Sequence, residues 1–103
     1  MTKKIINGKL YNTETATLVG EWWNDYCCND YRYCEENLYR KENGEFFLHG
    51  EGGPLSQYRE SCGDNCWGYG EEITPLPEQA AMQWAEKHLT ADEYIALFGD
   101  VAE

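Results

Sequence analysis

Five cysteines are the residues of this sequence best suited to chemistry. Three lie within eight positions, at Cys27, Cys28 and Cys34, and two more lie in the stretch SCGDNCWGYG, at Cys62 and Cys66. Zinc prefers four soft ligands at the corners of a tetrahedron, and cysteine thiolates supply them. The spacing therefore predicts a zinc site formed by Cys28, Cys34, Cys62 and Cys66, with Cys27 as the alternate to Cys28.

Two other interpretations of the cysteines stay open. Free cysteine is among the most buried residue types and often only fills space, and the thiols of a purified protein can also form disulfides. His49 is able to replace one thiolate as a zinc ligand, but a histidine at the end of an aromatic strand is more often a packing residue. No C-x-x-C motif is present, which argues against a redox enzyme.

The stretch HGEGG, at His49–Gly53, is the other candidate for chemistry. Glycine loops that bind phosphate need a strand before them, a helix after them and a nearby cation, and here Pro54 follows instead. We therefore predict an irregular turn whose glycines adopt positive φ. Ser56 and Ser61 lack a G-x-S-x-G elbow. Glu35, Glu36, Glu51 and Glu60 are candidates for the carboxylate pair of a hydrolase. Such pairs form easily by chance in so acidic a chain. We therefore predict that the protein is not an enzyme.

The charge of the chain restricts its partners. The formal net charge is −11, and residues 71–103 contain eight acidic residues and one lysine. Binding to nucleic acid needs a patch of lysine and arginine that neutralises phosphates, so no direct DNA or RNA partner is expected. The acidic field also repels anionic membranes, so no membrane partner is expected. An acidic field attracts basic surfaces, although acidity also serves solubility alone.

Residues 1–75 read as mainly β structure. Asn7-Gly8 and Asn43-Gly44 are strong hairpin signals between apolar or β-branched stretches. Strands are predicted over 13–23, 31–40 and 45–50, with a short edge strand at 55–59 and another beginning at 72. The stretch SCGDNCWGYGEE, which contains Cys62 and Cys66, reads as a loop. The glycines at 50, 52 and 53 argue against a regular strand interior there.

Residues 76–98 read as two helices. Pro77 suits a first helical turn, and apolar residues recur at helical spacing from Ala80 to Leu89. Thr90 and Glu93 form a capping box, and a second short helix ends at Gly99. The order of elements predicts one α+β domain over 1–103, an antiparallel sheet of four to six strands with both helices on one face.

Tyrosines and tryptophans are too numerous for one small core. Aromatic residues are enriched in binding patches, although tyrosine also occurs on outer sheet faces for its β-propensity alone. Aromatic side chains mixed with carboxylates predict a surface for a basic protein; the candidate residues are Asp25, Asp30, Tyr31, Tyr33, Glu35, Glu36, Trp67 and Tyr69.

No apolar run approaches 18 residues, and the N-terminal MTKKIINGKLY lacks the apolar core of a signal peptide. The expected location is therefore the cytosol.

Four stretches carry a family resemblance: KIINGKLYNTETAT, LYRKENGEFFLHGEGGPLSQY, NCWGYGEEITPL and AMQWAEKHLTADEYIALFG. Together they resemble a family of small acidic proteins carried by phages and mobile elements of Gram-positive bacteria. Some proteins of this setting are type II-A anti-CRISPR proteins. The resemblance implies an inhibitor that binds a basic, nucleic-acid-binding surface of a host defence nuclease such as Cas9. The alternatives are a small nucleotide- or ligand-binding protein or enzyme that uses His49–Gly53, and a structural zinc domain.

Overall fold

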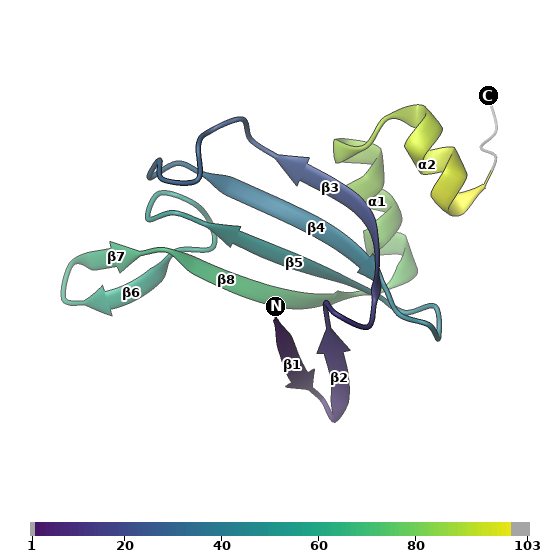
Figure 1. Cartoon of the computed structure of the whole chain (residues 1–103), viewed down its shortest axis with the longest axis horizontal. Coiled ribbons are helices and arrows are strands. Elements are labelled where there is room, and N and C mark those ends of the chain that lie inside the picture. Colours follow the sequence, from purple (N-terminus) through teal and green to yellow (C-terminus); the bar gives the residue numbers. More distant parts are fainter. Residues whose placement is uncertain (1, 100–103) are drawn as a thin grey trace.

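The computed structural model describes residues 2–99 of the 103-residue chain, and in them it shows an α+β fold (Figure 1). The central sheet has four antiparallel strands in the order β3 (Thr17–Trp23), β4 (Cys34–Arg40), β5 (Phe46–Gly52) and β8 (Gly70–Leu76). Two hairpins stand apart from it: β1 (Lys3–Ile6) with β2 (Lys9–Asn12), and β6 (Glu60–Gly63) with β7 (Cys66–Gly68). Helices α1 (Glu78–His88) and α2 (Ala91–Phe98) end the described chain. The predicted fold class is confirmed.

Both predicted hairpin turns are present. Asn7 and Gly8 connect β1 to β2 with φ angles of 53° and 78°, the two positive values that a type I′ turn requires. Gly44, with φ of 91°, lies in the turn between β4 and β5. In the same turn the Asn43 side chain accepts a hydrogen bond from the Glu45 backbone N–H at 3.0 Å.

Each face of the central sheet has its own core, because side chains alternate along a strand. On the helix face, Leu38 and Leu48 pack against Trp84 of α1. On the opposite face, Phe47 and Ile73 pack beneath Tyr11 of the β1–β2 hairpin. The β1–β2 hairpin covers only part of this second face of the central sheet. We call the part that the hairpin leaves uncovered the open face.

The helical prediction is confirmed at both helices. Pro77 directly precedes α1, and α1 buries the predicted stripe through Ala81, Trp84 and Ala85. Thr90 and Glu93 form the capping box of α2, which ends at Gly99 with φ of 93°. No helix within residues 2–99 combines the length and the apolar character needed to cross a membrane.

The prediction for the glycine-rich stretch was wrong. Gly50 and Gly52 lie inside the regular strand β5 and have no positive φ. Gly50 is required by packing instead, because a Cβ there would clash with the ring of Tyr58. A strand glycine can mark the close approach of another group, and here that group is the 53–59 segment.

Two neighbouring predictions also need correction. The segment expected as an edge strand, 55–59, forms turns, in which Ser56 Oγ donates to the Gly53 carbonyl at 2.8 Å. The segment expected as a loop around Cys62 and Cys66 forms the β6–β7 hairpin. In the 55–59 segment, the local side-chain hydrogen bond of Ser56 competes with the backbone pairing of a strand.

Candidate functional site

Three carboxylates lie side by side across the open face. Glu35 of β4 is the cross-strand partner of Glu51 of β5, and Glu51 is the partner of Glu71 of β8. We call these three residues the carboxylate row. Trp23 of β3 pairs with Glu35 and extends the line at its far end. Directly opposite residues lie about 5 Å apart at Cβ, so three acidic side chains share one strip of surface.

The row is electrostatically unfavourable in the isolated chain. Within residues 2–99, none of its carboxylates forms an ion pair with a lysine or an arginine. Burial, followed by the charge of Glu35, raises the pKa of the Glu51 carboxyl. Like charges placed directly opposite in a sheet are destabilising. The row therefore gains from any cation that reaches it.

His49 lies one row further along the same face. Its Nε2 atom is 3.1 Å from Glu71 Oε2. Ligand atoms of His49, Glu51 and Glu71 all lie within 4.8 Å of one another. Imidazole and carboxylate groups are ligands that divalent transition metals accept.

Two tyrosines border the row. The rings of Tyr33 and Tyr69 stack with centroids 6.2 Å apart, and the Tyr33 hydroxyl donates to Glu35. Burial and the neighbouring charges of Glu51 and Glu35 raise the pKa of Tyr69 to about 12. Tyr33 is buried, whereas Tyr69 remains half exposed. The border of the row is therefore aromatic and neutral at physiological pH.

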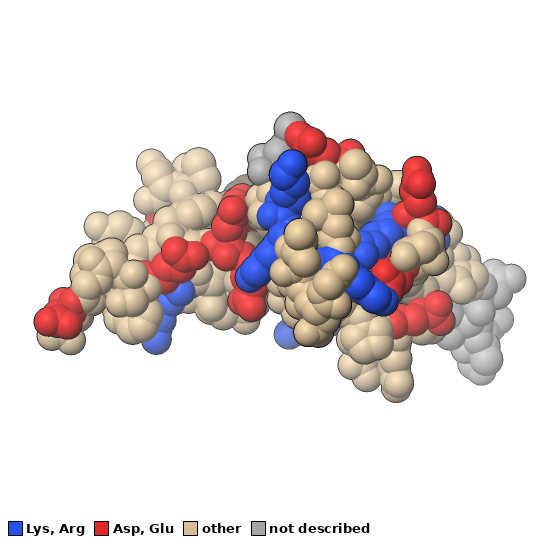
Figure 2. Space-filling view, turned by 90° about the horizontal axis from the view of Figure 1, so that it is seen from below, with Lys and Arg blue, Asp and Glu red and all other residues tan. Residues whose placement is uncertain are grey.

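Figure 2 shows how charge is distributed on the side of the molecule that carries the β1–β2 hairpin. Basic side chains gather near the centre of this view, and acidic side chains lie on both sides of them. Lys9 Nζ and Lys41 Nζ lie 2.6 and 3.2 Å from the Glu45 carboxylate, so the charges of these two lysines are already paired. The hydrogen bonds that Glu45 accepts from these lysines lower its pKa to about 2.

The predicted binding residues divide into two groups. Asp25, Tyr31, Trp67 and Tyr69 are exposed, and the half-buried Glu35 belongs to the row. Asp30 is held by Arg32, whose side-chain hydrogen bonds lower the pKa of Asp30 to about 2.

Glu36 and Tyr33 do not lie on the surface as predicted. Glu36 is only 6% exposed and points to the helix face, opposite to Glu35. Its Oε1 accepts from Trp84 Nε1 at 3.0 Å, and its Oε2 accepts from Gln57 Nε2 at 2.9 Å and from the Tyr58 hydroxyl. For Glu36 the reason is strand alternation, which sends neighbouring residues to opposite faces. Tyr33 stays on the side of Glu35 and stacks against the Tyr69 ring.

His88 lies close to the same buried carboxylate. Its Nε2 is 3.6 Å from Glu36 Oε1, and burial lowers the pKa of His88 although the Glu36 charge acts in the other direction. A neutral imidazole at pH 7 follows, so neutral hydrogen-bond donors hold the Glu36 carboxylate. This network ties the sheet to α1 and to the 53–59 segment.

The cysteines occupy three environments. Cys62 and Cys66 are joined by a disulfide, Cys34 is buried, and Cys27 and Cys28 are exposed. Burial raises the pKa of the Cys34 thiol to about 11. Zinc ligation by Cys62 and Cys66 requires their reduced thiolates, so the four-cysteine site stays a prediction for the reduced protein.

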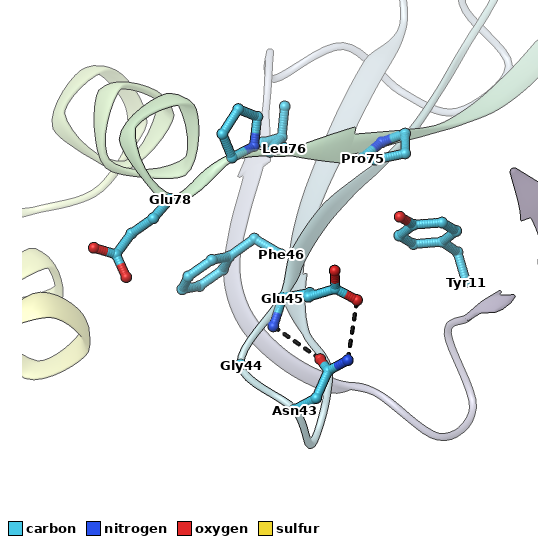
Figure 3. Close-up of a pocket in the computed structure, with 9 residues that line it drawn as sticks. Tyr11, Asn43, Gly44, Glu45, Phe46, Pro75, Leu76 and Glu78 are labelled. Atoms are coloured by element: carbon cyan, nitrogen blue, oxygen red, sulfur yellow. Dashed lines mark hydrogen bonds between the residues drawn. The ribbon is translucent and has the colours of Figure 1, made fainter. Parts of the chain in front are cut away.

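A pocket of 440 Å³ lies between Tyr11 of β2, the β4–β5 turn and the start of α1 (Figure 3). Two of its polar side chains are engaged with each other, since Asn43 Nδ2 donates to Glu45 Oε1 at 3.0 Å. Glu45 also receives Lys9 and Lys41. The Asn43 and Glu45 side chains are therefore already occupied, and Glu78 and Tyr11 supply the other polar groups of the lining.

Sequence reasoning missed the row because its members lie in three separate segments. A two-residue turn at Asn43-Gly44 would pair Glu35 with Gly52, whereas the longer turn in the structure pairs Arg40 with Phe46 and so Glu35 with Glu51. Glu71 joins through a long connection that carries no such signal.

Comparisons with protein-family models, with curated proteins and with solved structures gave no significant match.

Proposed function

We propose that this protein acts by binding the basic surface of another protein, with the carboxylate row as the centre of the contact. The observation that carries the proposal is the row itself: Glu35, Glu51 and Glu71 lie in cross-strand register. Among residues 2–99 they have no lysine or arginine partner. Arginine side chains of a partner would supply the missing cations, because a guanidinium group binds carboxylates in a bidentate manner.

Exposed aromatic side chains near the row support the same kind of partner. Trp23 and Tyr69 are each 49% exposed, at opposite ends of the row. Guanidinium groups stack on aromatic faces, and the chain does this within itself, with Arg59 4.1 Å from the centre of the Trp67 ring. Aromatic and arginine residues dominate the energetics of many protein interfaces.

The partner that we propose is a nucleic-acid-binding protein of the bacterial host. Surfaces that bind phosphates are rich in lysine and arginine, and a protein with net charge −11 is attracted to them. The family resemblance makes Cas9 the first partner to test. Occupation of such a surface would inhibit the nuclease, and the protein itself would need no catalytic chemistry.

The test compares two variants with equal net charge. E35Q/E51Q/E71Q neutralises the row, and E14Q/E42Q/E86Q neutralises three exposed carboxylates elsewhere. Binding to an arginine-rich peptide and to Cas9, and inhibition of Cas9 cleavage, are measured at about 50 and 300 mM salt. We expect the row variant to bind at least tenfold more weakly than the control variant, and all binding to weaken with salt.

Equal binding by the two variants would remove the row from the interface. Failure of the wild-type protein to bind or inhibit Cas9 at either salt concentration would exclude Cas9 as the partner. The peptide measurement separates these results, because it reports on the row without Cas9.

A second candidate function is binding of a divalent cation by His49, Glu51 and Glu71, favoured by the 4.8 Å spacing of their ligand atoms. Titration calorimetry with Zn²⁺ and elemental analysis of the purified protein test it. Loss of zinc in H49A would assign the metal to this cluster. Loss of zinc in C28S/C34S under reducing conditions would assign it to the predicted cysteine site.

A further inference from the structure

The β6–β7 hairpin projects from the end of the central sheet and has little core of its own (Figure 1). All of β6 is exposed, as are Cys66 and Trp67 of β7. The two strands pair only with each other, through three residue pairs with an irregularity between Ser61 and Gly63. An isolated two-stranded hairpin is only marginally stable in water, so this one depends on local restraints.

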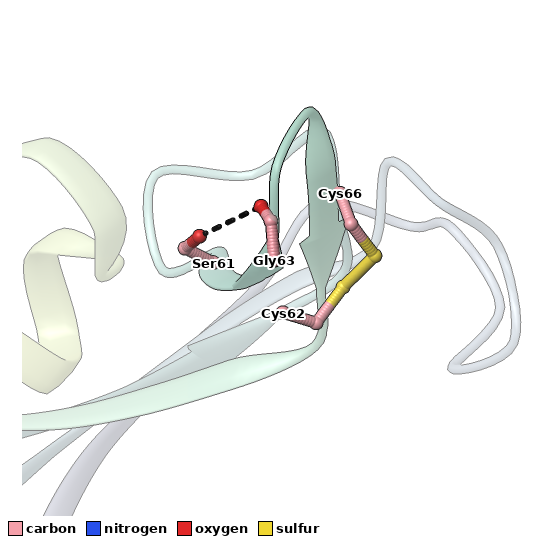
Figure 4. Close-up of a disulfide and its surroundings, with 4 residues drawn as sticks. All are labelled: Ser61, Cys62, Gly63 and Cys66. Carbon is pink, nitrogen blue, oxygen red and sulfur yellow. Dashed lines mark hydrogen bonds between the residues drawn. A yellow bond between two sulfur atoms is a disulfide. The ribbon is translucent and has the colours of Figure 1, made fainter.

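The strongest of these restraints is the disulfide between Cys62 and Cys66, which closes the turn (Figure 4). The other local contacts are a 3.3 Å hydrogen bond from Ser61 Oγ to the Gly63 carbonyl and the stacking of Arg59 on Trp67. Closing a five-residue loop covalently removes open conformations, and loop-entropy arithmetic favours the closed hairpin by roughly 30-fold. The bond is accessible to a reductant, because both cysteines are exposed.

The hairpin is directly connected to the proposed binding surface. Strand β7 is followed at once by Tyr69, which stacks on Tyr33 beside the carboxylate row, and then by β8, which carries Glu71. Trp67, which is 48% exposed, precedes Tyr69 at the border of the row by two residues in the sequence. Its position depends on the hairpin being closed.

We propose that the Cys62–Cys66 bond is a redox-controlled latch: the disulfide holds Trp67 in place as part of the binding surface, and reduction releases the hairpin and weakens binding to the basic partner. The consequence for binding rests on the function proposed above, whereas the opening of the hairpin does not.

The reaction is a thiol–disulfide exchange with a dithiol reductant. One thiolate of the reductant attacks a cysteine sulfur and displaces the other as a thiolate, which gives a mixed disulfide. The second thiol of the reductant then displaces the protein sulfur. Two electrons and two protons pass to Cys62 and Cys66, which become thiols, and the reductant becomes a disulfide.

Amide hydrogen exchange on the full chain tests the latch without any partner. The C27S/C28S protein, which lacks the exposed free thiols, is measured oxidised and after reduction with dithiothreitol. We expect exchange of residues 60–68 to rise about tenfold or more on reduction, with β4 and β5 unchanged. In C27S/C28S/C62S/C66S the same residues should exchange at the fast rate both with and without dithiothreitol.

Unchanged exchange of residues 60–68 on reduction would overturn the latch. The second measurement is affinity for the arginine-rich peptide, which should fall at least threefold on reduction and should be low in the four-serine variant. A hairpin that opens with no loss of affinity would overturn the role of the latch in binding. Absence of peptide binding by the oxidised protein would instead refute the proposed function, and exchange would still decide whether the hairpin opens.

Discussion

At the scale of single residues, Glu35 and Glu36 are neighbours in the chain but have opposite roles. Glu35 belongs to the carboxylate row on the open face, and Glu36 is buried on the helix face. The Glu36 carboxylate accepts hydrogen bonds from three side chains in two separate segments, so it links α1 and the 53–59 segment to the sheet. One of the two glutamates is therefore available to a partner, and the other stabilises the fold.

Replacing Glu36 should be strongly destabilising. E36A leaves the buried Trp84 N–H and the Tyr58 hydroxyl without their acceptor, and each such loss costs about 1–3 kcal/mol. We expect the free energy of unfolding in urea to fall by about 3 kcal/mol. E42A, at an exposed turn position, is the control and should change it by less than about 1 kcal/mol. Equal effects of the two substitutions would contradict the buried network.

Glu51 should make stability depend on pH. Its raised pKa means that the folded protein holds this proton to higher pH than the unfolded chain. The stability that this proton contributes is complete below the ordinary glutamate pKa of 4.5 and is lost as pH rises through the raised value. E51Q should therefore match wild type near pH 4 and exceed it by about 0.5–1 kcal/mol at pH 7.

Urea unfolding at a series of pH values measures this difference. E14Q, on an exposed turn outside the row, is the matched control and should show no gain that grows with pH. A difference between E51Q and wild type that stays constant from pH 4 to pH 7 would argue against the effect.

At the scale of elements, β5 shows how glycine serves packing within a strand. Gly50 leaves room for the Tyr58 ring, and Gly52 leaves room for Ser56 and for the backbone of Tyr33. The 53–59 segment can therefore lie flat on the end of the sheet and deliver the Tyr58 hydroxyl to Glu36. A larger residue in the strand would separate these layers.

G50A should consequently destabilise the protein although alanine suits a strand interior better than glycine does. The new Cβ would clash with the Tyr58 ring, and overpacking of this kind costs about 1–3 kcal/mol. G68A is the control, because its Cβ would have its nearest neighbours at 3.9 and 4.0 Å. Thermal unfolding of both variants checks the prediction, and a G50A protein as stable as G68A would disprove it.

At the scale of the whole molecule, a net charge of −11 on 103 residues opposes compaction. The row concentrates part of that repulsion in one place on the open face. Salt screens repulsion between exposed charges, with a Debye length of about 10 Å at 0.1 M. The protein should therefore become more stable as ionic strength rises, while its binding to basic partners becomes weaker.

Raising NaCl from about 10 to 200 mM should increase Tm by about 4 °C, equivalent to roughly 1 kcal/mol in a domain of this size. In E35Q/E51Q/E71Q the increase should be smaller than in E14Q/E42Q/E86Q, because the row carries the closest like charges. Calorimetric scans at several salt concentrations provide the measurement. The same increase in both variants would show that the row contributes no special repulsion.

Local sequence signals were sufficient for much of the fold. The Asn7-Gly8 pair produces its turn because both residues accept positive φ, and the Thr90–Glu93 capping box starts α2 because its bonds lie within one helical turn. The apolar stripe of α1 likewise follows from helical spacing. These features depend on residues close together in the sequence, and they were predicted correctly.

Tertiary structure alone decided the rest. The regular strand at Gly50 depends on Tyr58, the burial of Glu36 depends on Trp84, and the third member of the row, Glu71, arrives through the long connection between β5 and β8. The sequence shows where acidic residues and glycines occur, but it does not show which groups pack against them in the folded protein. Which carboxylate is buried and which is exposed is set by strand register and by the segments packed on each face, and both are properties of the folded chain.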